Sequence, residues 1–351
     1  MNKMNFIILL CVAFIITGCD TSNNLSGPDN LEGGSNSYIF IAGEGDMSSL
    51  GSGSISMIDE YGNVNILNEV GTTVHCVEVY NDKLLVSING DQKLLVYNID
   101  TMGIEYELEV LTEGQSPRDI MVINDKAYIT TWNSDWNVYP TISGFVKVLN
   151  LNSFEIEESI EVGIMPEGML YSDGYLWVAN SGESSVSKIN IESSLVSSVY
   201  EVGSGPQFLA DLNGDIYIAR ISYPNGYYYP PVFGTSKISS GGVEQIDHIS
   251  AAGSACGGSV LSLNNKVYRS FDGGIAQIGN NLEIDVLNRI GSFNQRNVYH
   301  IEVIDGNILF SLADYANLNQ VHVLNQYGDT ISEYEVGSTP GDFTFWKKSE
   351  E

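Results

Sequence analysis

Residues Pro166–Gly182 read PEGMLYSDGYLWVANSG, and this stretch carries the pattern that decides the fold. Two short runs, Met169–Tyr171 and Tyr175–Ala179, contain the alternating apolar, β-branched and aromatic residues that are typical of β-strands. Between them lies Ser172-Asp173-Gly174, and Asp and Gly favour tight turns. The stretch therefore predicts two neighbouring strands joined by a short turn.

The element in front of this stretch, Val162-Gly163-x-x-Pro166, recurs along the chain at intervals of roughly 38 to 50 residues. That interval is the period of propeller blades and is too long for leucine-rich or ankyrin repeats. Seven copies predict an all-β chain, folded as a seven-bladed β-propeller of four-stranded blades. The other copies are Val70-Gly71-x-x-Val74, Gly114-x-x-Pro117, Val202-Gly203-x-x-Pro206 and Val336-Gly337-x-x-Pro340, with looser ones around Gly253–Gly257 and Ile290–Val298.

The two ends of the repeat region complement each other. The first repeat supplies three strands, Tyr38–Ala42, Ser54–Ile58 and Val64–Glu69, and the C-terminus supplies one, Asp342–Trp346. Pairing them would complete the seventh blade and remove the open edges of a linear array, burying Phe343, Phe345 and Trp346. A six-bladed ring with a stray hairpin is the alternative.

The N-terminus has the layout of an export signal. Lys3 precedes the apolar run Met4–Ile16, and Ile16-Thr17-Gly18-Cys19 resembles a bacterial lipobox, in which the cysteine is lipidated. An ordinary cleaved signal with an incidental cysteine is the alternative. The expected organisation is a signal peptide at 1–18, a lipidated Cys19 with a flexible polar tether at 19–37, and the propeller at 38–349. This predicts a protein anchored by lipid in the cell envelope, with the outer membrane or the cell surface favoured.

The composition excludes one class of partner. A formal net charge of -29 and a sequence pI near 4.2 would repel phosphate backbones, so no nucleic-acid partner is expected. Cys76 and Cys256 fall in blades far apart around the ring, so they are predicted to be buried free thiols without a disulfide.

The chain resembles the YVTN-repeat, or YncE-like, seven-bladed propellers. The residues that carry the resemblance are Pro166–Gly182, the following strand Val186–Ile191 and Val202-Gly203-x-x-Pro206, while the repeat at Gly253–Gly279 has lost its proline. Such proteins include surface lipoproteins that capture corrinoids for an outer-membrane transporter. The resemblance therefore implies a small-molecule ligand, such as a corrinoid or another flat macrocycle, or a partner protein of the envelope.

Long aromatic loops are predicted on one face of the propeller, at the connections between second and third strands. Aromatic side chains offer a large contact area and suit a flat ligand. Alternatively, these loops pack their aromatic residues on one another as small local cores. The candidate ligand-binding residues are Trp132, Trp136, Tyr139, Tyr223, Tyr227, Tyr228, Tyr229, Phe233 and Tyr315.

Registering the blades on the repeated Gly-x-x-Pro element places a polar ring around the central channel, below the aromatic face. Arg118 and Gln207 are predicted to assist ligand binding there. The competing interpretation is that these residues satisfy neighbouring backbone groups or pair with each other, as Arg118 and Glu167 would. The other members of the ring are His75, Asp119, Glu167, Tyr299, His300 and Asp342.

Motifs of catalysis are absent from the sequence, which lacks Gly-x-Ser-x-Gly, Gly-x-x-x-x-Gly-Lys, His-Glu-x-x-His and Cys-x-x-Cys. His248 and His322 are expected on outer strands at the surface. His75 and His300 lack a third partner in the sequence pattern, so no metal and no cofactor is predicted. The leading hypothesis is a non-enzymatic ligand-binding module.

Two rival hypotheses remain. One is a lactonase-like hydrolase or lyase that uses His75 or His300, with Glu167, Asp119 or Asp342, around a divalent cation at the channel mouth. Close carboxylates with strongly shifted pKa values would favour it. The other is a purely structural envelope protein.

The lipobox generates the first test. Replacing Cys19 with serine removes the acyl acceptor, so the variant should appear in the soluble fraction after cell lysis. The measurement is membrane fractionation with an immunoblot, with the unchanged chain as the control. A processed Cys19→Ser protein that still sediments with membranes would contradict the anchor.

Overall fold

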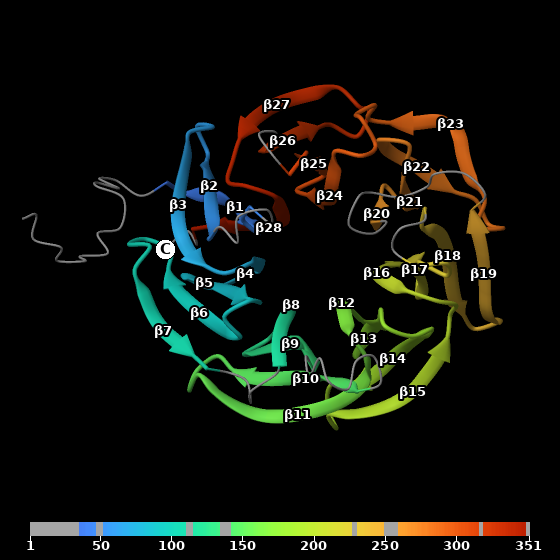
Figure 1. Cartoon of the computed structure of the whole chain (residues 1–351), viewed down its shortest axis with the longest axis horizontal. Coiled ribbons are helices and arrows are strands. Elements are labelled where there is room, and N and C mark those ends of the chain that lie inside the picture. The colour runs from blue at the N-terminus through green and yellow to red at the C-terminus, as the bar shows by residue number, and fades with distance from the viewer. Residues whose placement is uncertain are drawn as a thin grey trace, which may run out of the picture.

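The computed structural model describes residues 35–46, 52–109, 115–133, 142–226, 230–248, 259–315 and 319–348. These residues form seven four-stranded antiparallel sheets arranged as blades around a ring, as Figure 1 shows. The described ranges contain no α-helix, and hence none that is long and apolar enough to cross a membrane. The predicted seven-bladed β-propeller is confirmed, and the six-bladed alternative is wrong.

Each blade is a meander whose first strand lies nearest the centre of the ring (Figure 1). In order from inner to outer strand, the first three blades are β28 (Pro340–Lys347), β1 (Ser37–Gly43), β2 (Gly53–Asp59) and β3 (Val64–Gly71); then β4 (Val74–Tyr80), β5 (Lys83–Ile88), β6 (Lys93–Asn98) and β7 (Ile104–Leu108); then β8 (Gln115–Ile123), β9 (Lys126–Asn133), β10 (Ser143–Asn150) and β11 (Glu155–Ile164). The remaining four are β12 (Pro166–Ser172), β13 (Tyr175–Asn180), β14 (Ser185–Asn190) and β15 (Leu195–Glu201); then β16 (Pro206–Leu212), β17 (Asp215–Ser222), β18 (Val232–Ser239) and β19 (Gly242–His248); then β20 (Val260–Leu263), β21 (Lys266–Phe271), β22 (Gly274–Ile278) and β23 (Ile284–Ile290); then β24 (Val298–Ile304), β25 (Asn307–Ala313), β26 (Asn319–Leu324) and β27 (Thr330–Glu335).

The turn between the first and second strands has the same backbone form in several blades. Asp173 and Gly174 both have positive φ, at 51° and 80°, and Asn213 and Gly214 repeat this at 56° and 86°. Two consecutive residues with positive φ define the type I′ turn, whose twist matches that of the flanking strands. Asn, Asp and Gly adopt this conformation with little strain, which explains why they recur at the turns.

The hydrophobic core is divided into seven clusters of buried side chains, and each cluster lies between two neighbouring blades. Between β12–β15 and β16–β19, for example, Trp177, Val186 and Val202 pack with Ile216 and Ile218. A blade therefore buries both of its faces only when it has a neighbour on each side. The fold requires a closed ring.

The ring closes where β28 pairs with β1. Tyr38 lies opposite Trp346 and Ile41 opposite Phe343, in antiparallel register. Trp346 is 6% exposed, stacks on Tyr38 with ring centroids 5.9 Å apart, and donates a hydrogen bond from Nε1 to the carbonyl of Asn81 at 2.8 Å. The predicted completion of one blade by both ends of the repeat region is confirmed.

Two placements differ from the sequence-based expectation. Phe345 is 40% exposed: it shares a face of β28 with the buried Phe343, but it lies two residues nearer the end of the strand. His322 is buried in the third strand of its blade, where its ring packs against Phe293 and Nδ1 lies 3.3 Å from Glu333. It is therefore not a surface residue. Cys76 is buried and free, as predicted, and Cys256 lies outside the described residues.

The closing strand offers a paired test of ring closure. Trp346→Ala should reduce the free energy of unfolding by about 3–5 kcal/mol, since it removes a buried aromatic ring between two blades. Phe345→Ala on the same strand is the matched control and should cost much less. Urea unfolding followed by fluorescence and circular dichroism measures both. Equal losses for the two variants would mean that the strand does not close the ring through Trp346.

Candidate functional site

A cavity of about 630 Å³ runs into the centre of the ring. The inner strands of all seven blades line it, so it is the central channel of the propeller. The structure brings eight of the residues predicted from sequence to this one cavity: His75, Arg118, Asp119, Glu167, Gln207, Tyr299, His300 and Asp342.

β-Bulges in the inner strands orient these side chains toward the channel. In six blades the pairing of the inner strand skips one or two residues directly after the repeated element. A bulge bends the strand locally and redirects a side chain, here toward the channel. The skipped residues are His75, Arg118 with Asp119, Glu167 with Gly168, Gln207, Tyr299 and Gly341.

Two charged pairs lie in the part of the channel next to the repeated element. Arg118 donates two hydrogen bonds to Glu167, from Nε to Oε2 at 3.0 Å and from the terminal nitrogen to Oε1 at 2.8 Å. The guanidinium carbon of Arg118 lies 4.2 Å from the centroid of the Trp132 ring. This two-pronged pair, stacked on an aromatic ring, fixes a charged plane at the edge of the channel.

The second pair involves Glu44, which sequence analysis did not identify. Tyr299 donates its hydroxyl to Glu44 Oε2 at 2.7 Å, and His75 Nδ1 lies 3.4 Å from Glu44 Oε1. Burial alone would raise the pKa of Glu44, but the nearby His75, the hydrogen bond from Tyr299 and the charge of Arg118 outweigh it. The pKa of Glu44 is therefore lowered, and the group is a carboxylate at neutral pH.

Further along the inner strands lies a group of carboxyl groups that no lysine or arginine neutralises. It consists of Glu78, Asp119, Glu302 and Asp342, and among the described residues that line the channel Arg118 is the only lysine or arginine. Burial, together with the charges of the neighbouring carboxylates, raises the pKa of Glu78 to about 8 and those of Asp119 and Asp342 to about 7. Burial raises the pKa of Glu302 to about 8.

Two of these carboxyl groups, those of Asp342 and Asp119, also stabilise the fold. Asp342 Oδ2 accepts a hydrogen bond from the backbone N–H of Val77 at 2.9 Å, and Asp119 Oδ2 accepts one from Met169 at 2.7 Å. Each carboxylate thus satisfies the inner strand of the next blade. The competing interpretation from sequence, that ring residues serve neighbouring backbone groups, holds for these two oxygens.

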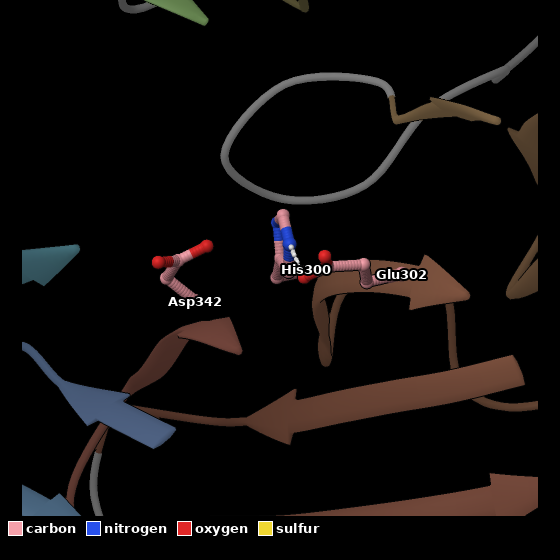
Figure 2. Close-up of side chains that lie close together, drawn as sticks. All are labelled: His300, Glu302 and Asp342. Atoms are coloured by element: carbon pink, nitrogen blue, oxygen red, sulfur yellow. Dashed lines mark ion pairs between the residues drawn. The ribbon is translucent and has the colours of Figure 1, made fainter. Parts of the chain in front are cut away.

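His300 stands among these acids. Its ring lies between Phe208 and Phe343, with centroids 5.6 Å from each, and burial lowers its pKa. Nε2 lies 3.5 Å from Glu302 Oε2. Donor atoms of His300, Glu302 and Asp342 all lie within 4.8 Å of one another. Figure 2 shows the two carboxylates on either side of the imidazole.

A second cavity of about 520 Å³ adjoins the channel, and Glu167 and Gln207 line both. Trp132 and Tyr223 line this groove, and Trp132 Nε1 donates a hydrogen bond to the carbonyl of Pro166 at 3.1 Å. The groove therefore joins two predicted aromatic residues to the polar channel.

The other predicted aromatic residues are placed differently. Tyr315 packs edge-on against Tyr299, with centroids 5.9 Å apart, and is 40% exposed. Phe233 on β18 lines neither of the two cavities. Trp136, Tyr139 and Tyr227 to Tyr229, like Cys19, lie outside the described residues.

Glu78 and Glu302 were missed from sequence, although a signal for them exists. Each lies two positions beyond a residue that lines the channel, Cys76 and His300 respectively. Side chains two apart on a strand share a face, so extending the ring register by one strand period would have found both.

The fold and its polar channel define a seven-bladed β-propeller with a solvent-accessible axial site. The chain belongs to the family described as "Domain of unknown function (DUF5074)", whose model matches residues 39–223. A search of curated proteins finds no match by sequence.

Several solved structures share the fold at low identity. BamB from Moraxella catarrhalis is 12% identical with a TM-score of 0.55, covering 79% of this chain and 79% of BamB. Apo AztD from Citrobacter koseri is 12% identical with a TM-score of 0.53, covering 90% of this chain and 99% of AztD. The dihydro-heme d1 dehydrogenase NirN in complex with DHE is 11% identical with a TM-score of 0.55, covering 89% and 75%. At these identities the likeness concerns the fold alone.

The acidic group predicts how stability depends on pH. Glu78 titrates near pH 4 when unfolded and at about 8 when folded, so between these values the folded state binds more protons. Its contribution is fully present below about pH 4 and is lost as the pH rises toward 8. Glu78→Gln imitates the protonated form, so it should flatten the fall of the melting temperature between pH 5 and pH 8.

Glu192→Gln, in an exposed turn, is the control with the same change of charge. Its melting temperature should follow the pH dependence of the unchanged protein. Thermal unfolding across this pH range measures all three proteins. A Glu78→Gln profile parallel to the original would contradict the burial of an uncompensated charge at this position.

Proposed function

We propose that this protein is a ligand-binding propeller of the cell envelope, anchored by lipid at Cys19, that captures a small molecule at the mouth of its central channel. The observation that supports the proposal is the junction of two cavities. There, the Arg118–Glu167 pair and Gln207 lie beside the aromatic rings of Trp132 and Tyr223. Ligand sites combine apolar walls with a few placed polar groups in this way.

The polar groups at the junction retain capacity for a ligand. Within the described residues, the side chain of Gln207 makes no hydrogen bond, although it lines both cavities. Arg118 is held in place by Glu167 and by the face of Trp132, so it presents a fixed donor plane at low entropic cost. The channel volume of about 630 Å³ falls within the usual range for small-molecule sites.

A flat macrocycle, with a corrinoid as the first candidate, is the ligand that we propose. Trp132 and Tyr223 in the groove and Tyr315 beside Tyr299 offer stacking surfaces near the polar junction. The resemblance to YVTN-repeat lipoproteins supports the same choice. A ligand captured in this way would pass to an envelope partner, such as an outer-membrane transporter.

A lactonase-like hydrolase or lyase is the second candidate. The observation in its favour is the group of carboxyls with pKa values of about 7 at Asp119 and Asp342, close to His300, since acid–base catalysts work best when their pKa lies near the operating pH. NirN shows that an enzyme can be built on a propeller of similar fold. At 11% identity, the activity of NirN cannot be assigned to this chain.

Calorimetry with cobalamin on a soluble chain lacking residues 1 to 19 tests the capture function. We expect binding, and we expect the double variant Trp132→Ala with Tyr223→Ala to weaken it by at least about tenfold, roughly 1.4 kcal/mol. Tyr327→Ala removes an aromatic ring that is 79% exposed and lies in a turn away from both cavities, so affinity should not change.

Two results would contradict the proposal. Absence of heat would exclude the corrinoid, and binding that the double variant leaves unchanged would place the site elsewhere. Hydrolysis of a lactone by the same preparation, lost in Asp342→Asn, would favour the enzyme instead.

A further inference from the structure

We propose that the channel holds a divalent transition-metal ion, bound by His300, Glu302 and Asp342. This site goes beyond the ligand site at the channel mouth and involves none of the aromatic residues there. The three side chains come from two neighbouring inner strands, β24 and β28, and Figure 2 shows Asp342 and Glu302 on the two sides of His300.

The donor atoms are close to metal-binding geometry. One nitrogen and two carboxylate oxygens lie within 4.8 Å of one another, and the pair between His300 Nε2 and Glu302 Oε2 is 3.5 Å apart. Ligands at about 2.0–2.2 Å from a zinc ion are roughly 3–4 Å from each other. Small side-chain rotations therefore suffice to bring the three donors into coordination.

Neighbouring groups hold two of the three ligands in place. The aromatic rings of Phe208 and Phe343 hold the imidazole of His300 from two sides. Asp342 is fixed by the backbone N–H of Val77. Supporting contacts of this kind are what orient the ligands in metal sites.

An independent observation concerns the hydrogen bonding of Glu302. Glu302 Oε2 is inaccessible to solvent and has no hydrogen-bond donor among the described residues, although it lies next to His300. A buried polar atom in this state is costly unless another group satisfies it. A metal ion bound to this oxygen would do so.

The excess of acidic groups in the channel also favours the binding of a cation. Six carboxyl groups line the channel, whereas both oxygens of Glu167 already engage the single lining arginine, Arg118. The charge of Arg118 is thus largely neutralised by Glu167 at the channel mouth, away from His300, Glu302 and Asp342. Backbone hydrogen bonds explain one oxygen each of Asp342 and Asp119, but they do not explain why two further acids, Glu78 and Glu302, share the same channel.

The donor set selects the class of metal. Carboxylate oxygens alone would suit Ca²⁺ or Mg²⁺, but an imidazole nitrogen with two carboxylates favours Zn²⁺ and related transition metals. Three protein ligands leave at least one coordination position open. That position faces the cavity of about 630 Å³, so the ion would be accessible to water or to a small ligand.

The test is a titration of the chelator-treated mature protein with Zn²⁺ alone, in competition with a chromophoric chelator. We expect one ion per chain, with Ca²⁺ and Mg²⁺ in excess failing to displace it. Glu302→Gln and Asp342→Asn keep the size of each side chain while weakening its oxygen as a ligand, and each should reduce the affinity at least about tenfold. His300→Ala should abolish binding at this stoichiometry.

His322→Gln is the matched control, because the buried His322 lies 3.3 Å from the exposed Glu333, and the described residues offer this pair no third ligand. Its affinity for Zn²⁺ should equal that of the original chain. Visible absorption of the Co²⁺-substituted protein gives a second readout, whose d–d bands should change in Glu302→Gln even if stability shifts. Zn²⁺ affinities within threefold across the Glu302, Asp342 and His300 variants would overturn the site. Because no organic ligand is present, this result is separate from the outcome with cobalamin.

Discussion

The structure depends on the closure of the ring by the pairing of β28 with β1. Every cluster of the core is shared by two blades, so an open array would leave two apolar faces in water. Closure also builds the channel, since it brings Asp342 on the last strand beside Val77 and within reach of His300. The residues that complete the fold are therefore the same ones that complete the acidic group in the channel.

The side chains of the inner strands form two regions of the channel, the mouth and a deeper part, which differ in their balance of acidic and basic groups. Near the mouth, Arg118 is hydrogen-bonded to Glu167, and Tyr299 is hydrogen-bonded to Glu44. Deeper in, the carboxyls outnumber the cationic groups, and protons or a bound cation must supply the missing charge. This difference in charge balance fits the proposal that the protein binds one species at the channel mouth and another deeper in the channel.

Much of this organisation could be predicted from the sequence because it repeats. The turn residues and the Gly-x-x-Pro element recur with the blade period, which predicted the fold, the closure and the ring positions such as His75 and Asp342. Features that do not recur from blade to blade were harder to predict. Glu44 reaches the mouth because its backbone N–H donates to the carbonyl of Thr339 across the closure, a contact between the two ends of the chain that no local pattern records. Glu302 was missed because only two positions of each inner strand were assigned to the ring. Phe345 was expected to be buried with Phe343, but it lies nearer the end of the strand and is exposed.

We infer that the chemistry of this protein lies in its channel, on the strands that close the ring. Anomalous X-ray scattering at the zinc edge, from crystals of the mature protein equilibrated with Zn²⁺, tests it most directly. We expect one dominant peak at about 2 Å from His300 Nε2 and from oxygens of Glu302 and Asp342. Peaks confined to carboxylates on the outer strands, with none in the channel, would contradict it.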